Sequence, residues 1–341
     1  MNSMERLGAV LTGGKQDRQM FTATLSMYGA KLISCPLKEY YNDAEKYLLG
    51  QQHVVEKIQP DIIFSPFSIP LEAHAFGSKI IYFPKNPPNV TAPVLNNADE
   101  IDTFTIPKLK TSAPHTYFLD SIQQLADQYK GIIPIAAPTS SPVDFPILLM
   151  GIEGWLDTFL FKRKQARKLI EMLIEYFVEW ANIQLQAGAD FVVVPVIFSN
   201  PEFLTQDLIQ KETLQYYNAA FSQINGPIVL HHGGAKMNNF ISNFANLPNV
   251  AAFVIDYKDS FSEARSEIRE RPVLVGNLDG PNLWRFDAEQ MKKVCAHKKK
   301  QMTGAGKIIL GTSNADVAYD TPLETLQALY TFVEEDWRFD G

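Results

Sequence analysis

The sequence predicts an α/β protein folded as one (β/α)8 TIM barrel that spans residues 1–341. Three observations favour this fold. Of the 341 residues, 46% are apolar, which is enough for one large core. Eight short apolar runs alternate with longer amphipathic segments, as in repeated strand–helix units. No Gly-x-Gly-x-x-Gly motif opens a predicted helix, so the alternative, an open doubly wound sheet, lacks its nucleotide-binding fingerprint.

The predicted strands are near-continuous apolar runs, typical of parallel strands covered on both faces. They are Gln19–Leu25, Asp61–Ser65, Ile132–Ala137, Asp190–Val196, Pro227–His231, Val250–Asp256, Val273–Leu278 and Lys307–Thr312. Amphipathic helices are predicted over Phe161–Gln186, Thr213–Phe221, Ser260–Arg269, Ala288–His297 and Thr321–Val333, and a helical extension is predicted at the N-terminus. The last helix begins Thr-Pro-Leu-Glu, which predicts Thr321 as its N-cap and Pro322 as its first residue.

The stretch 66–114 differs in composition from the rest of the chain. It is rich in proline and asparagine and contains the run Pro84-Lys85-Asn86-Pro87-Pro88-Asn89. Ordered loops of this length commonly serve as lids or binding loops. We expect Pro66–Pro114 to form a long loop excursion over one end of the barrel.

Composition excludes several classes of protein. The net charge is −7, and the one short basic run, Lys298–Lys300, lies in a predicted polar helix, so a nucleic-acid surface is not expected. The two cysteines, Cys35 and Cys295, make neither a disulfide framework nor a metal-ligand spacing. No apolar stretch resembles a signal peptide or is long enough to cross a membrane. We therefore expect a soluble, cytoplasmic protein.

Polar residues gather at the predicted carboxyl ends of the strands, where barrel enzymes place their chemistry. The candidates for binding or catalysis are Ser65, His231, His232, Gly233, Gly234, Asp256, Asn277, Asn314 and Asp316. Structural roles are the alternative for several of them. One of the two histidines could be simply buried, Asp256 could cap the next helix, and Asn277 could bind loop backbone groups.

A set of short motifs, taken in order, resembles the uroporphyrinogen decarboxylase superfamily, particularly its cobamide-dependent methyltransferases. The motifs are Asp17-Arg18, Pro60-Asp61-Ile62, Phe76-Gly77 before Tyr82-Phe83, Ala187-Gly188-Ala189-Asp190, Val229-Leu230-His231, Gly276-Asn277-Leu278-Asp279 and Thr321-Pro322-Leu323-Glu324. They cover almost the whole chain. The resemblance implies a barrel with its site at the strand ends, in agreement with the count of strands.

The chain departs from the decarboxylases of this superfamily at their functional positions. The segment that carries two substrate-binding arginines in those enzymes corresponds here to Ser26–Ala30, which has no arginine. Pro66 follows Phe64-Ser65 where the catalytic aspartate is expected, and Ala315 replaces the late histidine. The resemblance therefore does not imply decarboxylation of a polycarboxylate tetrapyrrole.

The methyltransferase branch holds zinc with a His-x-Cys pair and a later cysteine. His231 matches the histidine, but Gly233 and Ala315 stand at the two cysteine positions. A zinc site would therefore need oxygen and nitrogen ligands, for which His231, His232 and Asp316 are the candidates. The alternative is that no metal binds.

The resemblance implies a corrinoid-dependent methyltransferase component, which moves a methyl group between a small methylated substrate and a separate corrinoid protein. His231 and Asp316 are the expected catalytic residues, with His231 as general acid, while Asp256 and Asn277 position the substrate. The alternatives are a non-catalytic barrel that binds a corrinoid or tetrapyrrole and, last, a decarboxylase with a rebuilt site. A homodimer is compatible with each of these.

Overall fold

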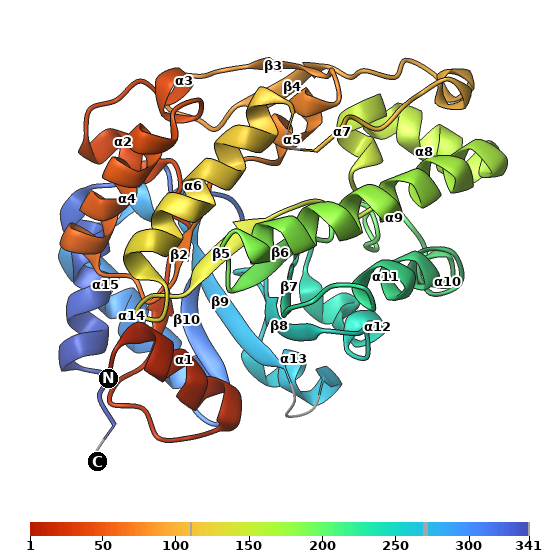
Figure 1. The fold of residues 1–341 in the computed structure, drawn as a ribbon. Helices are drawn as coiled ribbons and strands as arrows, with labels where there is room; N and C mark the ends of the chain where they lie inside the picture. Colours follow the sequence, from red (N-terminus) through yellow and green to blue (C-terminus); the bar gives the residue numbers. More distant parts are fainter. Residues whose placement is uncertain (110, 269–271, 340–341) are drawn as a thin grey trace.

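A computed structural model describes residues 1–109, 111–268 and 272–339 of the chain. Eight parallel strands form a nearly closed (β/α)8 barrel surrounded by helices (Figure 1). The strands are β1 (Phe21–Thr22), β2 (Ile63–Phe64), β5 (Ile135–Pro138), β6 (Phe191–Pro195), β7 (Ile228–His231), β8 (Val250–Val254), β9 (Val273–Asp279) and β10 (Ile308–Ser313). Their order in the sheet is β1-β10-β9-β8-β7-β6-β5-β2. Each predicted apolar run overlaps one of these strands, and β5, β9 and β10 each extend one residue beyond the predicted run. The predicted fold class is confirmed.

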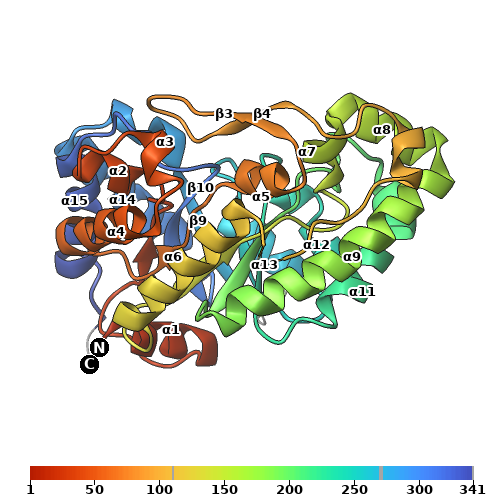
Figure 2. The same cartoon turned by 45° about the horizontal axis from the view of Figure 1, so that its top comes forward.

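Helices follow the strands and cover the outside of the barrel (Figures 1 and 2). They are α1 (Ser3–Thr12), α2 (Tyr28–Leu32), α3 (Leu37–Tyr40), α4 (Ala44–Ile58), α5 (Ile69–Ala75), α6 (Ala113–Tyr129), α7 (Pro146–Met150), α8 (Ile152–Phe161), α9 (Arg163–Gln186), α10 (Gln206–Leu208), α11 (Leu214–Phe221), α12 (Ile241–Phe244), α13 (Phe261–Ile268), α14 (Ala288–Met302) and α15 (Leu323–Glu335). Short 3-10 turns, η1 (Ala98–Asp102), η3 (Met237–Asn239) and η4 (Gly280–Arg285), and one π-helical turn, η2 (Ile209–Thr213), complete the set. Across these described residues, every helix is too short or too polar to span a bilayer.

Several predicted helix boundaries are wrong, and one lies outside the described residues. Helix α14 continues to Met302, five residues beyond the predicted end at His297. The helix predicted from Phe161 is divided, because α8 ends at that residue and α9 begins at Arg163. Helix α15 begins at Leu323, and Pro322 is its N-cap, with no side-chain cap bond. Thr321 is therefore not the cap; its carbonyl oxygen instead accepts hydrogen bonds from Tyr28 and Lys31. Arg269, the predicted end of another helix, lies outside the described residues.

The proline-rich excursion crosses the carboxyl end of the barrel. It carries α5 and a two-stranded antiparallel sheet, β3 (Lys79–Ile81) with β4 (Asn89–Ala92), which Figure 2 shows stretched over the top of the molecule. The excursion ends before Pro114, because the Ser112 hydroxyl accepts a hydrogen bond from the backbone of His115 and caps α6. The connection between β3 and β4 thus lies over the carboxyl ends of the barrel strands.

Asp61 joins the two ends of the sheet at the opposite end of the barrel. Its backbone N–H donates to the carbonyl oxygen of Phe21, and the N–H of Phe21 donates to its carboxylate at 2.9 Å. The carboxylate is fully buried and pairs with Arg6 of α1 and with Arg18, each at 2.7 Å. These bonds tie β1, β2 and the N-terminal helix together.

We expect Asp61→Ala to lower the free energy of unfolding by about 3–5 kcal/mol, because two nearly buried guanidinium groups lose their shared partner. Urea unfolding followed by circular dichroism measures the change. The control is Asp320→Ala, which breaks an exposed ion pair with Lys85 and should change little. Equal unfolding midpoints for the two variants would contradict this role of Asp61.

Candidate functional site

A cavity of about 680 Å³ opens among the carboxyl ends of the strands. Its walls come from the loop after β2, the β3–β4 connection, the ends of β6 and β7, and the segment after β10. The lining residues are Phe67, Ser68, Ile69, Pro70, Phe83, Asn86, Pro87, Pro88, Asn89, Pro195, Ile197, His231, Gly233, Gly234, Asn314, Ala315 and Asp316. Neither lysine nor arginine is among these described residues. The cavity is therefore largely apolar and offers no cation to an anionic ligand.

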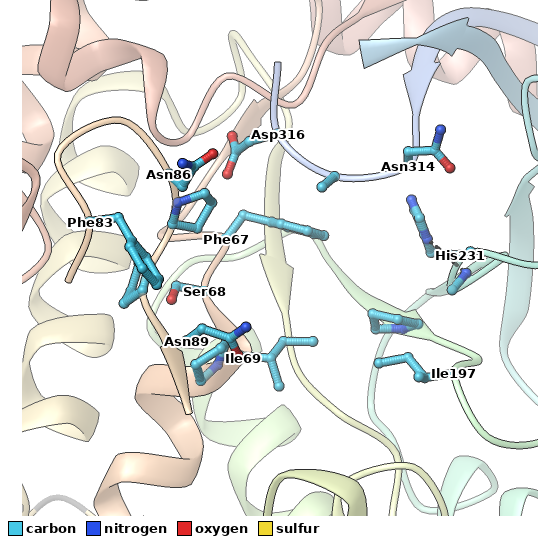
Figure 3. A pocket seen from close by; sticks show the side chains of 17 residues that line it. Phe67, Ser68, Ile69, Phe83, Asn86, Asn89, Ile197, His231, Asn314 and Asp316 are labelled. Carbon is cyan, nitrogen blue, oxygen red and sulfur yellow. Dashed lines mark hydrogen bonds between the residues drawn. The ribbon is translucent and has the colours of Figure 1, made fainter. Parts of the chain in front are cut away.

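The structure brings five of the nine sequence-predicted site residues to this cavity and places four behind its wall. His231, Gly233, Gly234, Asn314 and Asp316 line the cavity; Ser65, His232, Asp256 and Asn277 do not. In Figure 3, Phe67 reaches across the middle of the cavity, with Asp316 and Asn86 on one side and His231 and Asn314 on the other. The two expected catalytic residues thus face the same space from opposite sides.

Strand β7 directs His231 toward the barrel axis. Side chains alternate along a strand, and Val229 and His231 line the barrel interior while Leu230 packs into the outer core. The His231 ring stacks on that of His232, with the ring centroids 4.4 Å apart, and its Nδ1 accepts a hydrogen bond from the N–H of Gly233. Burial, with a further contribution from His232, lowers the pKa of His231 well below its usual range. A histidine with a pKa this low holds a second proton less readily than a free imidazole, which disfavours the expected role of general acid.

The backbone holds His232 behind the cavity wall. Its Nε2 accepts a hydrogen bond from the N–H of Asn314 at 3.0 Å, and its Nδ1 lies 3.0 Å from the N–H of Gly234 and 3.5 Å from Asp256 Oδ2. Both ring nitrogens therefore face the backbone, and neither is directed into the cavity. The role that this geometry supports is positional, because the ring fixes the loop after β10 against the loop after β7.

Asp316 is a buried carboxyl at the edge of the cavity. One oxygen, Oδ1, accepts a hydrogen bond from the N–H of Met27 at 3.2 Å, whereas Oδ2 is buried and has no hydrogen-bond partner among the described residues. Burial raises the pKa of Asp316 to about 8, against the opposing effect of the backbone N–H groups of Met27 and Ser26. The carboxyl therefore carries a proton at neutral pH, on a side chain that borders the cavity.

Gly233 and Gly234, which follow His232, differ in the space that surrounds them. A Cβ on Gly233 would lie 2.2 Å from the carbonyl oxygen of Val196, so a close backbone approach demands this glycine. A Cβ on Gly234 would meet nothing within 4 Å, although its φ of +107° favours glycine. Only Gly234 therefore leaves unfilled space for a ligand next to the backbone.

Asn277 and Asp256 are engaged with the protein itself. The Asn277 amide donates to the carbonyl oxygens of Asp256 and Asp259, and its Oδ1 accepts a hydrogen bond from Lys298. The Asp256 carboxylate accepts a hydrogen bond from the backbone of Lys258. These contacts match the structural alternative for Asn277 and leave neither side chain free to position a substrate. Ser65 is fully buried as well.

The described side chains do not assemble a zinc site from His231, His232 and Asp316. Nowhere in the described ranges do three His, Cys, Asp or Glu side chains come close enough to hold a metal ion together. His232 is turned into the backbone, and Figure 3 shows Asp316 across the cavity from His231. The donor set therefore does not fit a resident zinc ion.

Several lining residues were not predicted from the sequence. Phe67, Ser68 and Ile69 enter from the start of the excursion, where Ile69 begins α5, and Phe83 and Asn86 enter from its β3–β4 connection. The only sequence signal for them was the unusual composition of the excursion, because strand periodicity does not extend into loops. The hydroxyl of Ser26 accepts a hydrogen bond from the N–H of Phe67 and so anchors this loop.

Comparison with known proteins places the chain in a family. The model of the family described as Uroporphyrinogen decarboxylase (URO-D) matches residues 2–335. Among curated proteins, the methylcobamide:CoM methyltransferase MtaA of Methanosarcina barkeri is 23% identical over 275 residues, which cover 79% of this chain and 78% of that protein. The uroporphyrinogen decarboxylase of Coxiella burnetii (strain RSA 493 / Nine Mile phase I) is 24% identical over 292 residues, covering 80% and 76%.

Comparison with solved structures shows the same fold in another protein. A solved methyltransferase from Methanosarcina mazei superposes with a TM-score of 0.85 and covers 98% of this chain and 99% of that chain, at 19% identity. The resemblance predicted from the sequence motifs is confirmed.

We expect the stability of Asp316→Asn relative to the unsubstituted protein to rise as the pH rises from about 4 to about 8. In this window the unfolded chain has lost the Asp316 proton, because its ordinary pKa is about 3.9, whereas the folded protein keeps it. The folded state then binds one more proton, so raising the pH lowers its stability. The Asp316→Asn variant has no titrating carboxyl at this position, so this decrease in stability does not occur in it.

Urea midpoints across this pH range measure the effect. Asp320→Asn, an exposed carboxyl four residues later, is the control and should run parallel to the unsubstituted protein. A parallel curve for Asp316→Asn would show that this carboxyl is ionised when the protein is folded.

Proposed function

Because this chain belongs to the uroporphyrinogen decarboxylase family, and because a protonated carboxyl faces an uncharged cavity at its barrel mouth, we propose that it is a methyltransferase of the corrinoid-dependent kind. It moves a methyl group between a small methylated substrate and a corrinoid on a partner protein. The observation that carries the proposal is Asp316, whose unpartnered Oδ2 supplies the proton that such a leaving group needs. Similarity to the methyltransferases of Methanosarcina supports it.

The rim of the cavity fits a large, flat, mostly apolar ligand. Phe83, Pro87 and Pro88 of the excursion line it together with Pro195, the last residue of β6, and Ile197 of the following loop. Phe83 is 37% exposed, so this rim is accessible to another macromolecule. A corrinoid, when bound there, supplies the cobalt that exchanges the methyl group with the substrate. The excursion acts in this proposal as a lid over the substrate.

Asp316 acts as the general acid. When the bond between the methyl carbon and the heteroatom breaks, the heteroatom keeps the electron pair and takes the proton from Oδ2. The resulting carboxylate remains hydrogen-bonded to the N–H of Met27, which stabilises its charge. In the reverse direction the same carboxylate removes the proton. The uncharged ring of His231 lies across the cavity and orients the substrate through its hydrogen-bonding edge.

Decarboxylation of a tetrapyrrole that bears eight carboxylates does not suit this cavity. The positions that hold arginines in the decarboxylases are Ser26 and Ala30, both buried here. The Ser26 hydroxyl is used instead by Tyr47 and by the backbone of Phe67. No cationic side chain is found among the described lining residues, so carboxylates would have no partners.

We expect Asp316→Asn to lower the rate of methyl transfer by about 10²–10⁴-fold, the usual contribution of a general acid. The assay uses reduced cobalamin with a series of methyl ethers, amines and thioethers and follows the visible spectrum of the cobalt. Asp320→Asn serves as control and should keep the full rate, since its side chain is exposed and does not line the cavity. A cobalamin spectrum that changes on binding, with no methyl transfer from any substrate, would favour a non-catalytic barrel.

We expect no coproporphyrinogen when the protein is incubated with uroporphyrinogen, because the cavity offers neither arginine nor lysine to the substrate's carboxylates. Chromatography of the products tests this. Coproporphyrinogen formed at an enzymatic rate would refute the assignment of the site.

A further inference from the structure

A second cavity, of about 280 Å³, lies inside the barrel beneath the mouth. Strand residues that face the axis form its wall, and Met4, Leu7 and Leu11 of α1 contribute to its lining. Phe67 and His231 line both this space, which we name the lumen chamber, and the mouth cavity. The two spaces are therefore separated by these two rings, whose centroids are 6.4 Å apart.

The exposure of the strand residues shows that the chamber is unfilled. Val229 and Val254 face the axis and each keep 8% of their surface, although they lie inside a barrel. Their neighbours Leu230 and Phe253, which face the helices, keep none. In most barrels of this fold, layers of bulky side chains fill the interior. Here the short side chains of Ala252, Val229 and Val254 leave the centre of the barrel unfilled.

An empty apolar cavity favours apolar ligands over polar ones. An apolar cavity of about 150 Å³ stays dry and binds benzene or xenon, so the larger lumen chamber has room for a ring-sized hydrocarbon. Its polar atoms are few. The Thr312 hydroxyl accepts a hydrogen bond from the backbone N–H of Thr24. The Asp190 carboxylate accepts hydrogen bonds from the Lys130 ammonium group and from the backbone N–H of Ile135. Among the described lining residues there is no cation, as in the mouth.

We infer that the lumen chamber receives the compact alkyl or aryl body of an uncharged methylated substrate. The inference rests on the function proposed above for the mouth. In this arrangement the hydrocarbon lies below Phe67 and His231, the heteroatom lies at the level of His231 and Asp316, and the methyl group points out through the mouth. The substrate class is therefore a neutral methyl ether, amine or thioether with a hydrophobic body, rather than a sulfonate or carboxylate.

Toluene and benzoate, which share a ring and differ in charge, test the chamber without any need for activity. We expect the protein to bind toluene, seen by calorimetry and by shifted NMR signals of the lumen valines, and to reject benzoate. In xenon-pressurised crystals we expect xenon between the strands. No toluene binding and no xenon site inside the barrel would overturn the inference, and so would benzoate binding as tight as that of toluene.

Two matched substitutions locate the ligand. Ala252→Leu adds bulk to the lumen chamber, and Ala315→Leu adds the same bulk to the exposed side of the mouth. We expect toluene affinity to fall by about tenfold or more in the first variant and to stay in the second. Equal affinities in the two variants would overturn the inference. Should Ala252→Leu not fold, Val254→Ile fills the same wall with one extra methyl group.

Methyl-transfer kinetics separate this inference from the proposed function. A raised KM in Ala252→Leu for substrates with a hydrophobic body supports both. Methyl transfer with an unchanged KM in that variant refutes the chamber as the substrate site. Toluene binding without any methyl transfer refutes the proposed function and leaves the chamber as an apolar binding site.

Discussion

The buried carboxylate of Asp61 is the constraint on which the barrel depends. A closed sheet requires the two strands at its ends to meet, and here these strands, β1 and β2, are not paired with each other in the described sheet. The backbone and the carboxylate of Asp61 both bond to Phe21 across that seam, and two arginines neutralise the charge. Because Arg6 belongs to α1, the same ion pairs hold this helix under the barrel, where it lines the lumen chamber.

A closed barrel with an uncharged mouth then sets the chemistry of the site. Burial favours the neutral form of any titratable group that lacks a partner, so Asp316 keeps its proton and His231 loses its own. A nearby arginine or a metal ion would lower the pKa of Asp316 and favour its ionised form. The absence of lysine and arginine from the described lining residues therefore leaves the Asp316 carboxyl without a cationic partner, and its pKa stays raised.

The fold and part of the site could be predicted from the sequence, whereas the remaining site residues could not. The reason is physical. Apolar runs covered on both faces leave a clear signal, so all eight strands were found. Alternation along β7 places His231 in phase with Val229, toward the barrel axis, whereas the following residue, His232, faces away from the cavity. The path of Phe67 and Phe83 across the mouth depends on loop contacts such as that of Ser26, which no periodicity encodes.

The barrel has an unfilled interior, and two separate hydrophobic cores, one outside the sheet and one inside it, contribute to its stability. The outer core joins the sheet to the helices and contains the largest buried rings, including Trp155, Trp180 and Tyr217, whereas the inner cluster consists mainly of valine and alanine with few larger side chains. Because burial stabilises roughly in proportion to apolar area, most of the hydrophobic free energy comes from the outer core. The inner layer is therefore free to change for binding, while the Asp61 seam and the outer core preserve the fold.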